Sequence, residues 1–189
     1  PGGGGSDGSG DPGTPDIVFE GENKAFLSQF GLFNFASIVQ SDSQFARVLQ
    51  FGNGNNAFVD QAFDGGNSAF VYQAGSSVFV RNLASVLQTG AENRTDQVQF
   101  GDGNLAKALQ IGDGGHISQF QSGSYNKAYS IQFDDGNKAF IYQMDSHNFA
   151  TTNQFGTDDF AKISQSGHWN TATINQSGED DGNTAFSYQ

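Results

Sequence analysis

The sequence predicts an all-β fold: a flattened two-sheet β-solenoid of 15 short, parallel-stacked strands in about seven and a half rungs of 22 residues. Three observations predict it. A seven-residue motif recurs along the chain, residues within the motif alternate between two faces, and turns rich in glycine, aspartate and asparagine separate the copies. Because the repeat continues to residue 189, we expect one elongated array without a second lobe.

The motif is Asn-x-Ala-x-x-x-Gln, and its clearest copies begin at Asn104, Asn137, Asn148 and Asn170. There are 15 copies, which close on Gln29, Gln40, Gln50, Gln61, Gln73, Gln88, Gln99, Gln110, Gln121, Gln132, Gln143, Gln154, Gln165, Gln176 and Gln189. Ten of the 14 spacings are 11 residues, and the others are 10, 12, 15 and 13. Insertions therefore fall between copies, which indicates that the motif is a structural unit and that loops join the units.

The period within the motif favours a strand over a helix. Asn, Ala and Gln occupy positions 0, 2 and 6, and position 4 is usually aliphatic, as in Leu27, Ile38 and Val48. These positions share one face of a strand, whereas on a helix they would scatter around the axis. The following segments, such as 100–103 and 111–115, are rich in residues that adopt positive φ at low cost, which is typical of turns.

The identity of the repeats distinguishes a coil from an antiparallel meander. In a coil with two strands per rung, each strand lies parallel on the second strand after it, so each Asn, Ala and Gln meets its own kind. Amide side chains stacked about 4.8 Å apart can bond along such a ladder, which justifies burying them. The predicted ladder residues are Asn23, Gln29, Asn34, Gln40, Gln50, Gln61, Asn67, Gln73, Asn82, Gln88, Asn93, Gln99, Asn104, Gln110, Gln121, Asn126, Gln132, Asn137, Gln143, Asn148, Gln154, Gln165, Asn170, Gln176, Asn183 and Gln189.

The charged residues support this assignment of faces. Seven of the eight basic residues lie at odd, outward positions of the motif, and 17 of the 20 acidic residues lie outside the motif. Asp159, at position 0, is the one charge at an inward position. The outward positions also carry many phenylalanines and tyrosines, so the outer face is predicted to be aromatic as well as polar.

Residues 1–22 are predicted to be a glycine-rich disordered leader, and residues 23–189 the β-solenoid. The first apolar group, Ile17 to Phe19, leaves two alternatives open. It lies across the first rung as a partial cap, or it stays loose with the rest of the leader.

Composition excludes several classes of protein. With no cysteine there is no disulfide framework, and the apolar runs are too short for a transmembrane helix. The start is not a signal peptide, so we expect any export signal to have been removed. A net charge of -12 argues against nucleic acid and anionic membranes as partners.

No pattern of catalytic residues stands out, so we predict that the protein is not an enzyme and has no cofactor and no metal. Turn aspartates such as Asp102 and Asp113 are like those of calcium-binding β-rolls, but their position varies between repeats. The outer aromatic residues could bind glycans. The alternative function kept open is therefore a monomeric β-solenoid that binds calcium or glycans; an ice-binding face would need more than Thr171 and Thr173.

The stretch from Asn93 to Asn104, with Gln99 and Gly101 between them, resembles the curlin repeat of the bacterial functional amyloid curli. The resemblance covers residues 23–189, and the leader is similar to the segment by which curlin subunits are recognised for export. The chain departs from the family pattern at five places, where ladders are expected to be interrupted: Gln44, Gly115 and Asp159 replace Asn, and Thr95 and Ile117 replace Ala.

The resemblance implies a secreted structural subunit, most like the major fibre subunit. It would polymerise head to tail into extracellular amyloid fibres on the bacterial cell surface, for adhesion and biofilm matrix. Its implied partners are copies of itself, a nucleating curlin subunit and an outer-membrane secretion pore, without membrane insertion.

The first strand and the last two strands of the array are predicted to be open edges at which copies join. The residues expected there are Asn23, Ala25, Gln29, Asn170, Ala172, Gln176, Asn183, Ala185 and Gln189. If the coil continues without a gap, Asn23 to Ala25 of one copy stack on Asn170 to Ala172 of another. The alternative stacks the first strand on the fifteenth and leaves the fourteenth uncovered.

Overall fold

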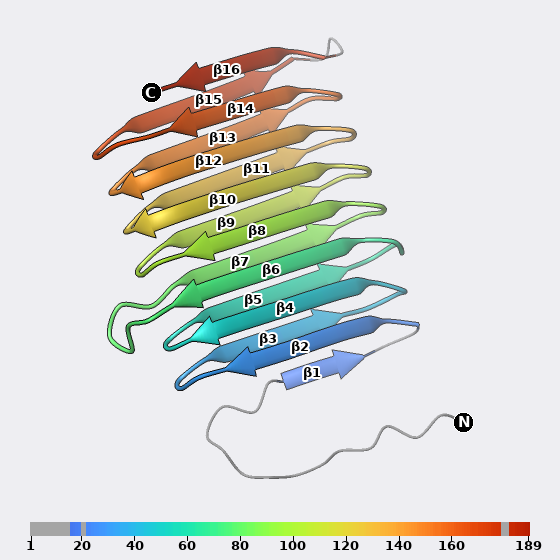
Figure 1. Cartoon of the computed structure of the whole chain (residues 1–189). Helices are drawn as coiled ribbons and strands as arrows, with labels where there is room; N and C mark the ends of the chain where they lie inside the picture. Colours follow the sequence, from blue (N-terminus) through green and yellow to red (C-terminus); the bar gives the residue numbers. More distant parts are fainter. Residues whose placement is uncertain (1–15, 20–21, 179–181) are drawn as a thin grey trace.

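The computed structural model describes residues 16–19, 22–178 and 182–189, and Figure 1 shows them as a stack of strands in two layers. All strand pairs are parallel, and consecutive strands alternate between two eight-stranded sheets. The predicted all-β, two-sheet β-solenoid is therefore confirmed. The described residues contain no helix, so none of them forms an apolar helix of membrane-spanning length.

Sheet A holds the odd-numbered strands β1 (Asp16–Phe19), β3 (Phe35–Gln40), β5 (Asn56–Ala62), β7 (Leu83–Thr89), β9 (Leu105–Ile111), β11 (Lys127–Phe133), β13 (Phe149–Phe155) and β15 (Thr171–Ser177). Sheet B holds the even-numbered strands β2 (Lys24–Phe30), β4 (Phe45–Gly52), β6 (Ser68–Gly75), β8 (Arg94–Phe100), β10 (His116–Ser124), β12 (Lys138–Ser146), β14 (Phe160–Gln165) and β16 (Thr184–Tyr188). The 15 predicted strands are β2 to β16.

β1 is a strand in addition to the 15 predicted from the motif. It pairs with β3, with Ile17 opposite Ile38 and Phe19 opposite Gln40. Of the two alternatives for this segment, the structure has the one in which it lies on the first rung. The rest of the predicted leader, apart from Glu22, falls outside the described residues.

The register aligns each motif with the motif one rung away. Ala128 lies between Ala106 and Ala150, and Gln132 between Gln110 and Gln154. The alignment persists across the longest spacing, because β5 still pairs with β7 and the extra residues loop out between β6 and β7. Insertions are therefore confined to loops, as the spacings predict.

The core lies between the two sheets and is formed by positions 2 and 4 of the motif. The strands alternate between buried and accessible residues, as in β5 and β15. Alanines at position 2, such as Ala46 and Ala128, are fully buried, and so are aliphatic side chains at position 4, such as Val48 and Ile163. The small alanines allow the two sheets to approach closely, and the aliphatic side chains fill the remaining space.

Aromatic rings stack along the outer surface of sheet B. A continuous run of six rings has neighbouring centroids 4.9 to 5.9 Å apart: Phe30, Phe51, Tyr72, Phe100, Phe120 and Tyr142. Two of these contacts join register partners, Phe30 with Phe51 and Phe120 with Tyr142. The other three are diagonal contacts between residues two positions apart in register, which outward aromatic side chains can also reach. These contacts reinforce the register from outside.

Close packing of the turns requires glycine at particular places. Gly101 has φ of 93°, and a Cβ at this residue would lie 2.1 Å from the carbonyl oxygen of Gly123 in the next turn. Gly114 has φ of 67°, but a Cβ there would meet nothing within 4 Å. The first glycine is thus required by both backbone conformation and space, and the second by conformation alone.

We expect Gly101→Ala to destabilise the fold by more than about 1 kcal/mol, because the added methyl group must push the stacked turns apart. Gly114→Ala is the matched control and should cost less, since it introduces strain in φ without a clash. Equilibrium unfolding of both variants in denaturant measures the difference. An equal loss of stability would show that turn stacking does not require Gly101.

Candidate functional site

The candidate functional site is the pair of glutamine ladders together with the sheet edges at which they end. In sheet A the ladder joins Gln40, Gln61, Gln88, Gln110, Gln132, Gln154 and Gln176. In sheet B it joins Gln29, Gln50, Gln73, Gln99, Gln121, Gln143, Gln165 and Gln189. Neither ladder is interrupted, and the nitrogen-to-oxygen distances lie between 2.6 and 3.0 Å.

Most amide nitrogens in the ladders donate twice, once along the ladder and once to a backbone carbonyl of the opposite sheet. Gln99 Nε2 donates to Gln121 Oε1 at 2.9 Å and to the backbone carbonyl of Leu83, on the opposite sheet, at 3.1 Å. Gln121 makes the corresponding bonds to Gln143 and Leu105. The ladders therefore hold successive rungs together and also tie the two sheets to each other, which satisfies the buried amides.

The ladders have a direction. In every bond the donor belongs to the earlier rung and the acceptor to the later one, as in the pair Gln88 and Gln110. Each ladder therefore has an acceptor end, at Gln29 and Gln40, and a donor end, at Gln176 and Gln189. The two ends of one molecule are complementary to each other.

Most asparagine side chains bond to backbone groups and not to one another, which differs from the predicted ladder of stacked amides. Asn104 Oδ1 accepts the backbone N–H of Asn126 at 3.0 Å, while Asn104 Nδ2 donates to the carbonyls of Phe100 at 2.9 Å and Gly123 at 2.8 Å. Direct amide-to-amide bonds also occur early in the array, where Asn55 Nδ2 donates to Asn34 Oδ1. The asparagines thus clamp the turns of adjacent rungs.

Two of the substituted asparagine positions keep this contact, contrary to the expected interruption. Gln44 Oε1 accepts the backbone N–H of Asn67 at 2.9 Å, and Asp159 Oδ1 accepts that of Asn183 at 3.0 Å. Gly115 donates its own N–H to Asn93 but has no side chain with which to continue the ladder. A long amide or a carboxylate reaches the same backbone group, so acceptor capacity is what the position requires.

The substituted alanine positions are also accommodated. The Thr95 hydroxyl donates to Gln110 Oε1 at 2.7 Å and accepts from Gln88 Nε2 at 3.2 Å. Ile117 is fully buried in a small apolar cluster with Ala108 and Ala139. The glutamine ladder of sheet A therefore passes Thr95 without a break.

A second set of buried polar side chains occupies position 4 in the middle of the array. Gln97 Nε2 donates to Gln119 Oε1 at 2.9 Å, Gln119 Nε2 donates to the Ser130 hydroxyl at 3.0 Å, and the Thr152 hydroxyl donates to the same serine at 3.0 Å. We did not predict this network from the sequence. Its signal was the presence of polar residues where other copies of the motif carry Val or Ile.

An ionic cluster lies on the outer face of sheet B. Arg94 Nε is 2.8 Å from Asp96 Oδ2, and His116 Nε2 is 3.4 Å from the same oxygen. Burial raises the pKa of the Asp96 carboxyl, but the hydrogen bonds and charges of His116 and Arg94 outweigh it, so that pKa lies below its ordinary value. This pairing stabilises the fold at neutral pH, and the contribution is lost as the pH falls and Asp96 is protonated.

Asp102 anchors the long loop between β6 and β7. Its carboxylate accepts the backbone N–H groups of Ser76 at 2.8 Å and Ser77 at 3.0 Å, and the Ser76 hydroxyl at 3.0 Å. Desolvation by itself would raise the pKa of the Asp102 carboxyl. The hydrogen bonds from Ser76 and Ser77 have the larger, opposite effect, so this pKa lies below its ordinary value. The loop is therefore tied to the next turn along the stack.

Other turn aspartates make similar contacts. Asp113 Oδ1 accepts the N–H of Ala91 at 2.7 Å, and Asp135 Oδ1 accepts that of Asp113 at 2.8 Å. Within the described part of the chain, no three His, Asp or Glu side chains gather closely enough to hold a metal ion. These carboxylates serve as hydrogen-bond acceptors for neighbouring turns.

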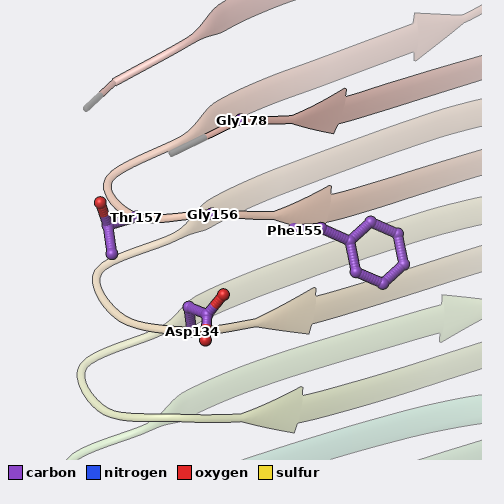
Figure 2. A pocket seen from close by; sticks show the side chains of 5 residues that line it. All are labelled: Asp134, Phe155, Gly156, Thr157 and Gly178. Carbon is purple, nitrogen blue, oxygen red and sulfur yellow. The ribbon is translucent and has the colours of Figure 1, made fainter. Parts of the chain in front are cut away.

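A recess of about 330 Å³ lies on three successive turns at one side of the stack, and Figure 2 shows the residues that line it. Its lining includes Asp134, Thr157 and Gly178, with the ring of Phe155 at the end of β13. Phe155 stacks on Phe133, with centroids 5.2 Å apart. The recess is an irregularity between stacked turns, and a single carboxylate faces it.

The residues predicted for the joining edges lie at the two ends of the stack (Figure 1). β2, which follows Asn23 and contains Ala25 and Gln29, is the first strand of sheet B, and β16, with Ala185, is its last. β15 is the last described strand of sheet A, whereas β1, not β3, is the first. The structure therefore brings the predicted edge residues to the ends, with one strand more than expected at the start.

The family profile described as curlin associated repeat matches residues 146–178 and 156–186. This stretch is similar to curlin associated repeats. The same motif, spacing and register continue through the earlier strands, from β2 onward. Comparison with curated proteins and with solved structures gave no match.

We expect Gln110→Ala to destabilise the fold more than Phe140→Ser. The first change removes the donor to Gln132 Oε1 and the acceptor for the Thr95 hydroxyl, both buried, at a cost of roughly 1–3 kcal/mol each, while Gln88 Nε2 keeps its bonds to Ser68 and Thr95. The second removes outer ring contacts with His116 and Phe160. Denaturant unfolding of the soluble chain compares the two, and a larger loss for Phe140→Ser would contradict the assignment of the ladders as the main constraint.

We expect Asp159→Asn to stabilise the fold by about 1–3 kcal/mol. Asp159 is 1% exposed, and its Oδ2 has no hydrogen-bond partner among the described residues. One rung earlier, Asn137 Nδ2 donates to the carbonyls of Phe133 and Gly156, and an amide at 159 supplies the same kind of donor.

The control for this change is Asp158→Asn, which removes the same charge from the neighbouring exposed residue and should have little effect. Thermal unfolding of the soluble chain measures both variants. Equal melting temperatures for the two variants would indicate that the buried oxygen of Asp159 carries no penalty.

Proposed function

We propose that the chain is a secreted structural subunit that polymerises head to tail into extracellular, curli-like amyloid fibres for adhesion and biofilm matrix. The observation that carries the proposal is the direction of the glutamine ladders. One end of the stack carries acceptors at Gln29 and Gln40, and the other carries donors at Gln176 and Gln189. A second copy in the same direction extends both ladders by the bond that already repeats inside the molecule.

The backbone supports the same conclusion. The outermost strands of a sheet have N–H and C=O groups on one side that no strand pairs, and such an edge is a template for another chain. Because the strands are parallel and in register, an added copy with the same repeat meets like residues at every position. Strands stacked perpendicular to the long axis, with ladders of identical side chains, form the cross-β arrangement of amyloid fibres.

The similarity of residues 146–186 to curlin associated repeats also supports the proposal that the chain is a fibre subunit. Its setting in curli is the bacterial cell surface, so we place this chain outside the cell. The nucleating curlin subunit and the outer-membrane secretion pore are proposed partners on the strength of the resemblance. We propose no catalytic role for any side chain.

The test is assembly of the purified full chain at micromolar concentration in buffer without calcium. We expect thioflavin-positive fibres by electron microscopy, and fibre diffraction with a meridional spacing of about 4.7–4.8 Å. Chains that remain monomeric in analytical ultracentrifugation would contradict the proposed polymerisation. Monomers that bind calcium or glycans under these conditions would favour the alternative function.

A further inference from the structure

The first strand of sheet A does not match the edge that it covers. β1 pairs with β3 over four residues and places Phe19 opposite Gln40, where each later strand of sheet A has a glutamine. Gln40 is 1% exposed, and its Oε1 has no hydrogen-bond partner among the described residues. The acceptor end of this ladder is therefore buried at the edge that β1 covers, and no described donor bonds to it.

The other side of Gln40 is satisfied. Its Nε2 donates to Gln61 Oε1 at 2.8 Å, as the ladder requires. The missing hydrogen bond is therefore the one to Gln40 Oε1, on the side that faces β1. A buried acceptor without a partner is costly, so β1 is a weaker cover for this edge than a strand that carries the motif.

The missing donor is present at the opposite end of the molecule. Gln189 accepts from Gln165 at 2.9 Å, and its Nε2 donates to the backbone carbonyl of Thr171 at 3.0 Å. An amide nitrogen has a second hydrogen, which every earlier glutamine of this ladder donates to the next rung. Gln176 is in the same state at the end of sheet A, where its Nε2 donates to the carbonyl of Phe160.

We propose that β1 is an exchangeable strand, which covers the edge of β3 in the single chain and is displaced by β16 of a second copy. This inference rests on the proposed function and specifies how copies join. In the joined state β16 lies on β3 and β15 lies on β2. Gln189 then donates to Gln40, and Gln176 donates to Gln29, so both ladders pass through the junction without a break.

The alternative junction keeps β1 in place, with β1 on β15 and β2 on β16. It preserves the orientation of each copy, but the register sets Phe19 against Gln176. The donor of Gln176 is then covered without an acceptor, and Gln40 remains unsatisfied. Two unpaired amide groups at every junction, compared with none after exchange, favour the exchanged form.

The two junctions exclude each other for a geometric reason. Strands alternate between the sheets, so a copy that sets β2 on β15 brings its β1 to the place of β16. β1 must leave before this copy can join. Displacement therefore adds a step before growth, and a covered edge in the single chain limits joining until that step occurs.

The first experiment reads the junction from engineered disulfides in fibres. Lys24, Thr171 and Thr184 are exposed and occupy the same motif position in β2, β15 and β16, and the chain has no cysteine of its own. Adjacent parallel strands about 4.8 Å apart are within reach of a disulfide. We expect efficient intermolecular cross-linking of Lys24→Cys with Thr171→Cys, and little with the matched Thr184→Cys.

The second experiment locks β1 onto its own chain. Val18 and Val39 are register partners in β1 and β3, so Val18→Cys with Val39→Cys places two cysteines on neighbouring strands. We expect the oxidised variant to elongate fibre seeds at least tenfold more slowly than the reduced variant, because β1 cannot leave. Val39→Cys alone, under the same oxidant, is the control and should elongate normally.

The outcomes separate this inference from the proposed function. Fibres that cross-link through Lys24→Cys and Thr184→Cys, or an oxidised lock that elongates as fast as its reduced form, would overturn strand exchange while leaving the fibre function intact. A wild-type chain that forms no fibres would overturn both. Two results together support strand exchange. They are cross-linking of Lys24→Cys with Thr171→Cys in fibres, and slow elongation of the oxidised Val18→Cys, Val39→Cys variant that becomes normal on reduction.

Discussion

The need to satisfy buried amides governs this structure. An inward glutamine has a donor and an acceptor on its amide, and a narrow interior between two sheets holds few groups that can pair with them. In-register parallel stacking solves the problem, because an identical side chain lies one rung away and offers the complementary atom. The two unbroken ladders tie each strand to the strands above and below it, and their second hydrogen bonds tie sheet to sheet.

The same requirement explains where the chain tolerates variation. A shift of one residue in any strand would turn its glutamine outward and leave its neighbours unpaired, so the register is strongly specified. Extra residues are accepted in the loops, as between β6 and β7, where Asp102 holds the inserted segment against the next turn. Substitution at inward positions is accepted when the new side chain keeps the acceptor, as Gln44 and Asp159 do.

A ladder with direction cannot satisfy its own ends, and this connects the fold to the proposed assembly. The groups that stabilise each rung inside the stack are left open at Gln176 and Gln189, and they fit the opposite end of another copy. β1 partly covers that opposite end without supplying the matching donor. In the proposed assembly, folding and joining therefore depend on the same interaction, and the single chain would differ from the fibre in which strand lies on β3.

The sequence by itself determined the fold class, the inward face of each motif strand and the parallel stacking. These follow from a two-residue period and from the identity of repeats, which are local properties of the chain. It also indicated that like motif and turn residues would line up along the stack. With a spacing of 11 residues and two strands per rung, every second copy of the motif lies on the same sheet.

The tertiary structure alone decided the role of the asparagines, because each side chain bonds backbone groups of turns that lie far along the sequence, as Asn104 does with Gly123. It also decided the place of β1, whose residues carry none of the motif's Asn, Ala and Gln. The one sequence signal was Ile17, which precedes Leu27 by ten residues, a spacing that the motif also shows between Gln40 and Gln50. A search for side-chain identity misses such a strand, because pairing with β3 requires only backbone groups in register.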